Sequence, residues 1–178
     1  MNAIIVRQYG DPDVMKMEEV PTPTPRAGQV LVRVRAAGVN PADTYGRSGL
    51  TRRSLPYTPG TDGAGVVEAV GPEVKSRKPG ERVYIAGSIT GTYAEYALAL
   101  EPQVPPMPEK ISFAQGAGLF VPYTTAFRAL SQVAHARAGE TLLIHGASGG
   151  VGIAAAQFGT PPPVVSCPTK VVAEEVAW

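Results

Sequence analysis

A glycine-rich turn near the end of the chain holds the residues best suited to chemistry. Residues 147–152 read Ala-Ser-Gly-Gly-Val-Gly and fit the spacing A-x-G-x-x-G, with alanine where a first glycine usually stands. Between a strand and a helix, such a turn lets backbone N–H groups approach a pyrophosphate at the helix N-terminus. The cofactor-binding candidates here are Ser148, Gly149, Gly150, Val151 and Gly152. The motif alone leaves open a tight strand-to-helix turn without a ligand.

A second polar cluster lies in residues 38–49, which read GVNPADTYGRSG. Asn40 suits the N-cap of a helix, Pro41 its first position and Asp43 its first turn. Glycines at positions 46 and 49 limit the predicted helix to about one turn. On the residues alone, Asn40 and Asp43 are capping residues, and Tyr45 is a half-buried packing residue.

The residue types that bind zinc are scarce in this chain. It has one cysteine, Cys167, and two histidines, His135 and His145, and their spacing fits no zinc motif. Because a catalytic zinc needs about three protein ligands, we predict no metal site. One cysteine also excludes an internal disulfide, which fits a reducing compartment.

Composition and charge argue against several other classes. The 178 residues are 44% hydrophobic and 17% charged, which is typical of a globular protein. The net charge is +1 and the densest basic spot is the pair Arg52 and Arg53, so nucleic-acid binding is not indicated. The apolar run at residues 3–6 is too short for a signal peptide, and no stretch approaches the ~20 apolar residues of a membrane helix. We therefore expect a soluble, cytoplasmic protein.

Short strands joined by glycine and proline turns dominate the first part of the chain. Residues 3–8 predict a first strand, and the alternating residues 29–38 predict an antiparallel strand with one exposed face. One face of that strand carries Val30, Val32, Val34 and Ala36, and the other Leu31, Arg33 and Arg35. The segments GAGVVEAVG, PGERVYIAG and TYAEYALAL predict three more strands. Their close spacing suggests a partly open β-barrel.

The pattern changes after residue 110. Ser112 and Gln115 have the spacing of a capping box. Residues 123–139 then predict a helix that ends at a glycine. Its apolar face would hold Ala126, Leu130, Val133 and Ala134.

A continuous apolar strand is predicted next, at residues 140–146, with the pattern of a strand buried in a parallel sheet. We therefore divide the chain into a barrel-like domain at 1–110 and a second segment at 111–158. The second segment holds a bridging helix and the start of a Rossmann-type dinucleotide-binding domain.

Five motifs taken together resemble a known family. They are GVNPADTYGRSG, PYTPGTDGAGVVEAVG, GTYAEYAL, PYTTAFRAL and LIHGASGGVG, in this order. They resemble the zinc-independent, zeta-crystallin-like quinone oxidoreductases of the medium-chain dehydrogenase/reductase superfamily. The resemblance implies a mixed α and β fold, in which a GroES-like, partly open β-barrel domain precedes an incomplete Rossmann-type α/β unit. It also implies NADPH as cofactor and a quinone-type small molecule as acceptor.

The same resemblance assigns roles to individual residues. It implies that Asn40, Asp43 and Tyr45 are catalytic residues beside the nicotinamide, with Tyr45 also binding the cofactor and polarising an acceptor oxygen. It implies that Thr125 lies near the nicotinamide, where the alternative is a threonine on a helix surface. Zinc-dependent relatives carry metal ligands where this chain has Asn40 and Gly60-Thr61-Asp62. Without a metal, hydride transfer depends mainly on orientation of the cofactor and acceptor.

The chain departs from the family pattern after residue 158. Three prolines at 161–163 end the helix after the glycine turn, because proline lacks an N–H and clashes with the preceding turn. In the family, a residue about 20 positions after the glycines, on the next strand, binds the ribose of the cofactor. No credible strand is found at that distance in this chain. We expect 159–178 to be a divergent, disordered tail of a C-terminally truncated chain.

Two hypotheses about function stay open from this pattern. The first is an NADPH-dependent quinone oxidoreductase. The second is an inactive truncated isoform that acts, if at all, through protein–protein interaction. Whether the chain forms a homo-oligomer like those of the family is also open. The expected truncation after residue 158 argues against it.

Overall fold

The computed structural model describes residues 1–137, 140 and 142–159. The chain divides into two compact units, Met1–Phe120 and Val121–Trp178, which we call unit 1 and unit 2. All but the first residue of the predicted tail, 159–178, lie outside the described residues.

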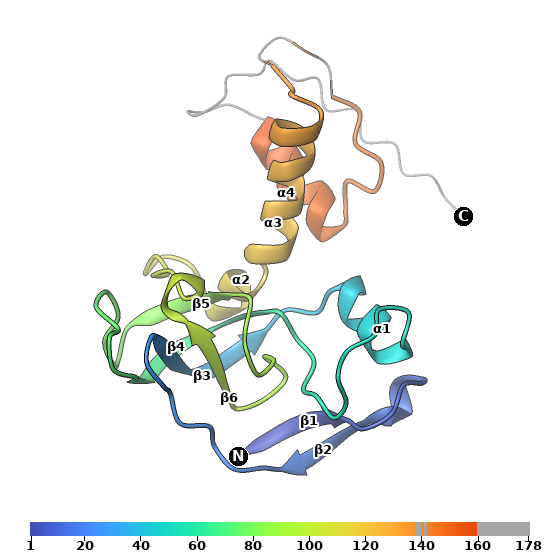
Figure 1. Ribbon diagram of the computed structural model, residues 1–178. Helices are drawn as coiled ribbons and strands as arrows, with labels where there is room; N and C mark the ends of the chain where they lie inside the picture. Colours follow the sequence, from blue (N-terminus) through green and yellow to red (C-terminus); the bar gives the residue numbers. More distant parts are fainter. Residues whose placement is uncertain (138–139, 141, 160–178) are drawn as a thin grey trace. The chain divides into compact units, whose positions relative to one another are not determined.

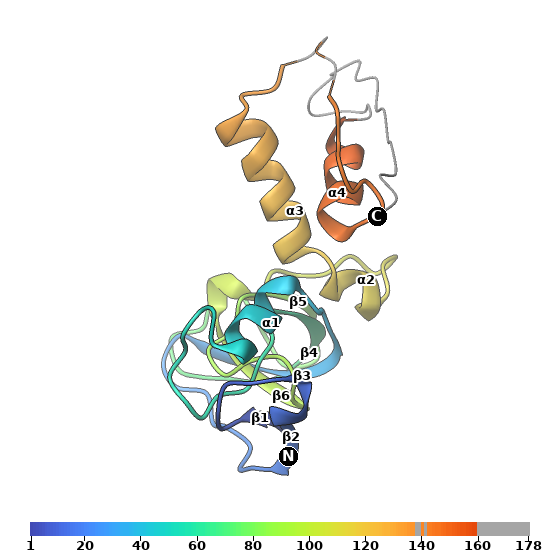
Figure 2. The same ribbon diagram turned by 90° about the vertical axis from the view of Figure 1, so that its right-hand side faces the viewer.

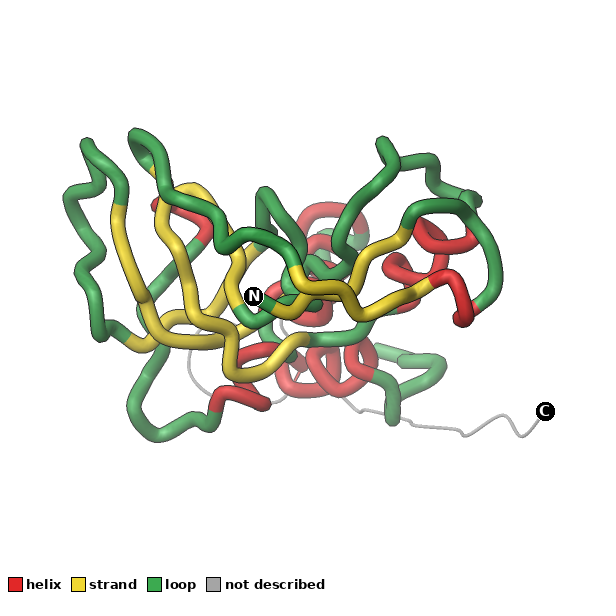
Figure 3. Tube along the Cα trace, turned by 90° about the horizontal axis from the view of Figure 1, so that it is seen from below, coloured by secondary structure: helices red, strands yellow, loops and turns green. Residues whose placement is uncertain are grey.

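Unit 1 contains two antiparallel sheets, whose strands are yellow in Figure 3. One sheet pairs β1 with β2, and the other has the order β5-β4-β3-β6 (Figure 1). The strands are β1 (Asn2–Val6), β2 (Met15–Glu19), β3 (Gln29–Ala37), β4 (Asp62–Val70), β5 (Arg82–Ala86) and β6 (Tyr96–Leu100). Five of these six lie where the sequence predicts strands, and β2 was not foreseen.

The core of unit 1 lies on the four-stranded sheet. It consists of small and β-branched residues that fit a pleated, half-buried surface. The buried set is Val30, Val32, Val67, Val83, Ile85, Ala97, Ala99 and Val104. The central strand β3 contributes its first half to this core and pairs with β4 on one side and β6 on the other.

Leu31 departs from the alternation predicted for β3. It is only 5% exposed, although the pattern placed it on the same face as Arg33 and Arg35. The register shift beside Leu31 adds its extra residue, Glu68, to β4, so β3 still turns Leu31 away from Val30 and Val32. The face that carries Leu31 is therefore covered at this position, although the same strand exposes Arg33. The prediction that Leu31 lies on the exposed face is therefore wrong.

Helix α1 spans Pro41–Ser48 and is longer than the single turn predicted. Its glycine at position 46 lies inside the helix rather than ending it. Gly49 ends the helix instead, with a left-handed φ of 85° that suits glycine at a helix C-terminus.

Three short helical segments complete unit 1. These are the 3₁₀ turns η1 (Pro12–Val14) and η2 (Glu101–Gln103) and the helix α2 (Phe113–Ala117). The capping box predicted before α2 is confirmed. Ser112 Oγ accepts from Gln115 N at 3.2 Å, and Gln115 Oε1 accepts from Ser112 N at 2.8 Å.

The described part of unit 2 is helical. It holds most of α3 (Phe120–Phe127), the π-helical segment η3 (Arg128–Val133) and α4 (Gly150–Gly159). Figure 2 shows α3 beside α4. The Tyr123 and Phe158 rings meet edge to face at 5.9 Å between centroids, and Tyr123 donates a hydrogen bond to Gln157. These contacts hold α4 against α3.

Two predictions for unit 2 are wrong for the described residues. The helix expected at 123–139 starts at Phe120 and ends at Val133. On its expected apolar face, Ala126 is 1% exposed but Val133 is 69% exposed. The described residues of 140–146 form no continuous strand, and among them only Leu143 takes part in a β-bridge. A strand or an apolar face needs neighbours to pair with or pack on, and the described part of unit 2 contains no sheet.

Within the described residues, every helix is too short or too polar to span a bilayer.

Candidate functional site

A buried amide–carboxylate pair connects α1 to β4. Asn40, at the N-cap of α1, is 8% exposed, and Asp62, the first residue of β4, is 1% exposed. Asn40 Nδ2 donates to Asp62 Oδ2 at 3.1 Å. Thr92 Oγ1 donates to the Asp62 backbone oxygen at 2.7 Å, which connects the loop before β6 to the same point. The amide of Asn40 therefore anchors α1 to the sheet, and makes no side-chain hydrogen bond as a cap.

The carboxylate of Asp43 caps α1. Its Oδ2 accepts from the Asn40 backbone N–H at 2.9 Å and from the Tyr93 hydroxyl at 3.1 Å. Burial, together with the nearby Asp43 carboxylate, raises the pKa of Tyr93 well above its usual value. Tyr93 therefore stays protonated at neutral pH and remains a hydrogen-bond donor to Asp43.

Tyr45 differs from Asn40 and Asp43 in its exposure and in its hydrogen bonds. It is 46% exposed, and its hydroxyl makes no hydrogen bond to any described residue. Asn40 and Asp43, in contrast, already have hydrogen-bond partners. Of the three predicted catalytic residues, Tyr45 is thus the exposed one, and the one whose side chain makes no hydrogen bond to a described residue.

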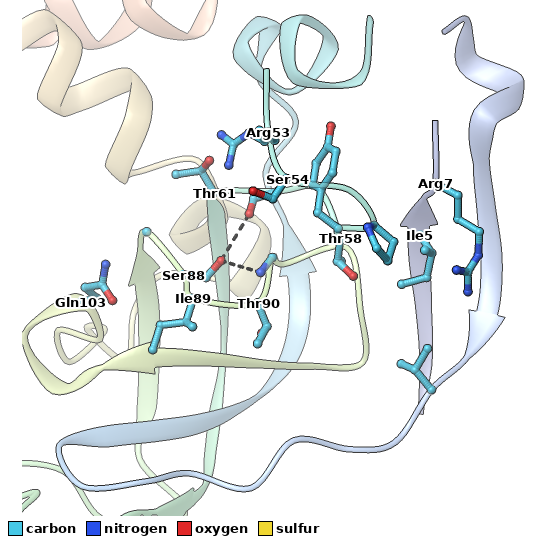
Figure 4. Close-up of a pocket in the computed structure, with 16 residues that line it drawn as sticks. Ile5, Arg7, Arg53, Ser54, Thr58, Thr61, Ser88, Ile89, Thr90 and Gln103 are labelled. Carbon is cyan, nitrogen blue, oxygen red and sulfur yellow. Dashed lines mark hydrogen bonds between the residues drawn. The ribbon is translucent and has the colours of Figure 1, made fainter. Parts of the chain in front are cut away.

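A cleft of about 750 Å³ opens in unit 1, and we call it the unit 1 cleft. Its walls come from β1, from the loop that leads to β4 and from the loop between β5 and β6 (Figure 4). Ser88 joins the two loops, because its Oγ donates to Gly60 O at 3.3 Å and accepts from Gly91 N at 3.0 Å. Thr61 lines the cleft next to the buried Asp62.

Two glycines are required where these loops approach each other. Gly91 has a φ of 86°, and a Cβ there would lie 2.1 Å from the Thr58 oxygen. Gly60 has a φ of 100°, and a Cβ there would lie 2.2 Å from Thr92 Oγ1. Both the left-handed backbone and the close approach exclude other residues. The glycines thus allow the two loops that line the cleft to lie in contact.

In unit 2, the predicted glycine turn leads into α4. Gly149 N donates to Gly146 O at 3.0 Å, which closes the turn. A Cβ at Gly152 would lie 2.2 Å from Gly146 O, so only glycine lets the helix approach the turn this closely. Ser148, Gly149, Gly150 and Val151 are exposed. Their backbone N–H groups stand at the N-terminus of a helix, where anions are favoured.

Thr125 lies on α3, in the same unit as the glycine turn, and is exposed. The predicted cofactor residues Thr125, Ser148, Gly149, Gly150, Val151 and Gly152 thus belong to unit 2, whereas Tyr45 belongs to unit 1. Among the described residues, no three His, Cys, Asp or Glu side chains gather as metal ligands would.

The sequence of this chain matches a known domain family and known oxidoreductases. Residues 26–109 match the alcohol dehydrogenase GroES-like domain. Over 161 residues the chain is 51% identical to quinone oxidoreductase from Pongo abelii and 54% identical to that from Sus scrofa. The chain is a relative of the quinone oxidoreductases. The aligned part is 89% of this chain and 49% of each relative, so the chain spans about half their length.

The fold of the chain also matches that of a solved quinone oxidoreductase. The Escherichia coli quinone oxidoreductase complexed with NADPH superposes with a TM-score of 0.88 and 33% identity, over 97% of this chain and 52% of that one. The zeta-crystallin-like resemblance predicted from five motifs is confirmed. The predicted mixed α and β fold with a GroES-like domain is confirmed as well.

Sequence reasoning about this quinone oxidoreductase relative did not find Asp62 and Tyr93 as hydrogen-bond partners of Asn40 and Asp43, although the resemblance had placed Asp62 where zinc-dependent relatives carry metal ligands. Both contact α1 only through the tertiary fold, across 22 and 50 residues of sequence respectively. One signal pointed to Asp62, which is a charged residue at the start of a strand that otherwise begins with small, buried residues. No sequence signal distinguished Tyr93 from the other tyrosines.

Proposed function

We propose that this chain carries the GroES-like domain and the pyrophosphate-binding turn of an NADPH-dependent quinone oxidoreductase that uses no zinc. The observation that carries the proposal is the turn before α4, where Gly152 alone permits the close approach of helix and turn. The identity of 51% to 54% with quinone oxidoreductases supports the same reaction class.

The glycine turn fits a pyrophosphate group. Exposed backbone at Ser148 and Gly150 offers N–H groups, and the Ser148 hydroxyl adds one more donor, while the Gly149 N–H closes the turn. We infer that these residues hold the pyrophosphate of NADPH and that Thr125 binds toward the nicotinamide end. NADPH, when bound, supplies the hydride, and the chain supplies binding and orientation.

Tyr45 is our candidate for the residue that contacts the acceptor. A phenol O–H donates to a carbonyl oxygen and stabilises the negative charge that develops there on reduction. Asn40 and Asp43 act through helix α1, because Asn40 Nδ2 donates to Asp62 and Asp43 Oδ2 accepts from Tyr93. We therefore propose Tyr45 as a catalytic residue and Asn40 and Asp43 as positioning residues.

The acceptor we propose is a quinone-type compound, which is flat and carries electron-poor carbonyl groups. The unit 1 cleft, at about 750 Å³, has the size of small-molecule sites, which span ~300–1,000 Å³. A cytoplasmic location belongs to the same proposal and is supported by the single cysteine of the chain.

A second candidate is a chain without catalytic activity that binds a protein partner. Exposed apolar side chains in unit 2 favour it, and such groups mark interaction surfaces when they are contiguous. They include Phe127, Val133, Leu143, Val151 and Ile153, each between 41% and 69% exposed. A full-length quinone oxidoreductase subunit is the partner this alternative predicts.

Titration of the purified chain with NADPH, followed by nucleotide fluorescence, tests the proposal. We expect saturable binding at micromolar NADPH, abolished in Gly152→Val because the new side chain cannot fit beside Gly146. Gly118→Ala is the matched control, since a Cβ at Gly118 lies no closer than 3.6 Å to any neighbour. Circular dichroism checks that both variants keep their helices.

A quinone-dependent loss of NADPH absorbance then reports on the reaction itself. Absence of binding up to millimolar NADPH overturns the proposal for this chain. If the same chain also sediments as a complex with a full-length quinone oxidoreductase subunit, the second candidate is favoured.

A further inference from the structure

The lining of the unit 1 cleft is cationic. Arg7 and Arg53 both line the cleft, and none of its lining residues is Asp or Glu. Arginine carries its charge throughout the physiological pH range. Ser54 and Thr61 add hydroxyl groups to the same lining, and all four residues are labelled in Figure 4. The lining of the cleft therefore offers donors and positive charge and contains no carboxylate.

The two arginines differ in how their charge is used. Arg7 makes a bidentate pair with Glu18, with Nε to Oε1 at 2.9 Å and Nη2 to Oε2 at 2.7 Å. Arg53 makes no ion pair with any residue that the structure describes. The positive charge of Arg53 is the one that remains for a ligand.

Two hydrogen bonds fix the backbone of Arg53, and one ring contact positions its guanidinium. The Tyr9 hydroxyl donates to Arg53 O and accepts from Arg53 N, the second bond at 3.0 Å. The Arg53 guanidinium lies 5.8 Å from the centroid of the Tyr57 ring. Gly46 on α1 leaves room for the side chain, because a Cβ there would lie 3.2 Å from Arg53 Nε. A group that is ordered before binding loses less entropy when it binds.

The cleft also offers an apolar surface that suits an aromatic ring. Ile5, Val20, Pro56 and Ile89 line it along with the polar groups. Pockets of this kind bind rings through apolar contacts and set orientation through a few polar groups.

We propose that the unit 1 cleft prefers aromatic acceptors that carry an anionic substituent, and that Arg53 is the residue that binds that substituent. The quinone identity of the acceptor rests on the proposed function. The charge preference rests on unit 1 alone, and so it is measured without NADPH.

The test compares two probes that differ in charge but have nearly the same shape. Anthraquinone-2-sulfonate and its neutral primary sulfonamide are titrated against the purified chain without NADPH, followed by tyrosine and tryptophan fluorescence. We expect the sulfonate to bind about tenfold more tightly, the size expected for a hydrogen bond to a charged group. The preference should shrink as sodium chloride is raised, since salt screens exposed charges.

Arg53→Gln should remove the preference, so that both probes bind with similar affinity. Arg52→Gln is the matched control, because Arg52 is the neighbouring exposed arginine and does not line the cleft. It removes the same net charge and should keep the preference. Thermal unfolding followed by circular dichroism checks that both variants fold.

Three results overturn the inference. They are equal binding of the two probes, no binding of the sulfonate, and an equal loss of the sulfonate preference in Arg52→Gln and Arg53→Gln. Each leaves the NADPH titration of the proposed function unaffected. If the chain fails to bind NADPH but prefers the sulfonate, the proposed function is refuted and the inference about Arg53 stands.

Discussion

At the scale of single residues, one carboxylate oxygen organises the start of α1. Asp43 Oδ2 receives the backbone N–H of Asn40 and the hydroxyl of Tyr93. The sequence predicted Asp43 in the first turn of a helix and predicted Asn40 as its cap. The structure assigns the capping to Asp43 and leaves the Asn40 amide to bind Asp62. A buried polar group needs a partner, and the Asp62 carboxylate provides one for Asn40.

Tyr93→Phe should destabilise the chain by about 1 kcal/mol at neutral pH, because it removes one hydrogen bond to Asp43. Urea unfolding followed by circular dichroism measures the loss. Tyr96→Phe is the control, since Tyr96 lies on β6 in the same sheet and its hydroxyl makes no hydrogen bond to a described residue. Equal loss in the two variants would show that the Tyr93 hydroxyl contributes nothing specific.

The stability of the chain should also fall at alkaline pH. Burial raises the pKa of Tyr93 in the folded state above its ordinary value of 10.0, and the pKa of Tyr57 is raised by burial as well. Stability from a raised pKa is complete below the unfolded pKa and is lost as pH rises toward the folded one. Urea midpoints measured between about pH 9 and about pH 11 should therefore fall, and fall less in Tyr93→Phe. A pH dependence identical in Tyr93→Phe would contradict this assignment.

At the scale of secondary-structure elements, α1 carries Tyr45 of the proposed catalytic site and lies beside Arg53 of the unit 1 cleft. It presents Tyr45 to solvent, and its internal Gly46 makes room for Arg53 and for the Tyr57 hydroxyl. That hydroxyl is buried and makes no hydrogen bond to a described residue. The sequence predicted Gly46 as a helix breaker, whereas tertiary packing keeps it inside the helix at a cost in backbone entropy.

Gly46→Ala should weaken the preference for the sulfonate probe while it stabilises the helix only slightly. Alanine gains up to ~1 kcal/mol over glycine inside a helix. The new Cβ, however, would lie 3.1 Å from the Tyr57 hydroxyl and 3.2 Å from Arg53 Nε, so Arg53 must move. We expect a net stability gain below ~1 kcal/mol and a reduced sulfonate preference in the probe titration.

Ser48→Ala on the same helix is the control for Gly46→Ala. The Ser48 hydroxyl is exposed and bonds only to the Tyr45 oxygen of its own helix. Its replacement should leave the sulfonate preference unchanged. An unchanged preference in Gly46→Ala would show that the position of Arg53 does not depend on the space at Gly46.

At the scale of the whole molecule, the two units differ in how their apolar groups are buried. Unit 1 has a continuous core on a four-stranded sheet. The described part of unit 2 contains helices and loops but no sheet, and keeps large apolar side chains exposed, among them Phe127, Val133 and Leu143. A core of this kind is what lets a domain fold by itself, and exposed apolar groups invite association.

Residues 1–120 alone should therefore fold cooperatively and expose less apolar surface than the full chain. Urea unfolding should give a single transition, and binding of the dye ANS, which reports exposed apolar surface, should fall when residues 121–178 are removed. An unfolded circular dichroism spectrum for 1–120, or unchanged ANS binding, would contradict the division into units.

The sequence by itself determined the local features of this protein. Alternation and short apolar segments between glycine and proline turns predicted five of the six strands, the Ser112–Gln115 spacing predicted a cap, and five motifs together predicted the family. These features depend on neighbours a few residues apart, and so the local pattern contains them. The glycine turn was also predicted locally, since Gly152 contacts a residue only six positions away.

Tertiary structure alone decided which polar groups meet and which charges remain unpaired. The contacts of Asp62 with Asn40 and of Tyr93 with Asp43 join segments that only the fold brings together. The same holds for the arginines of the cleft, where Glu18 pairs with Arg7 and leaves the charge of Arg53 for a ligand. Sequence spacing does not encode such pairs, because packing of the sheet and its loops sets the distance between them.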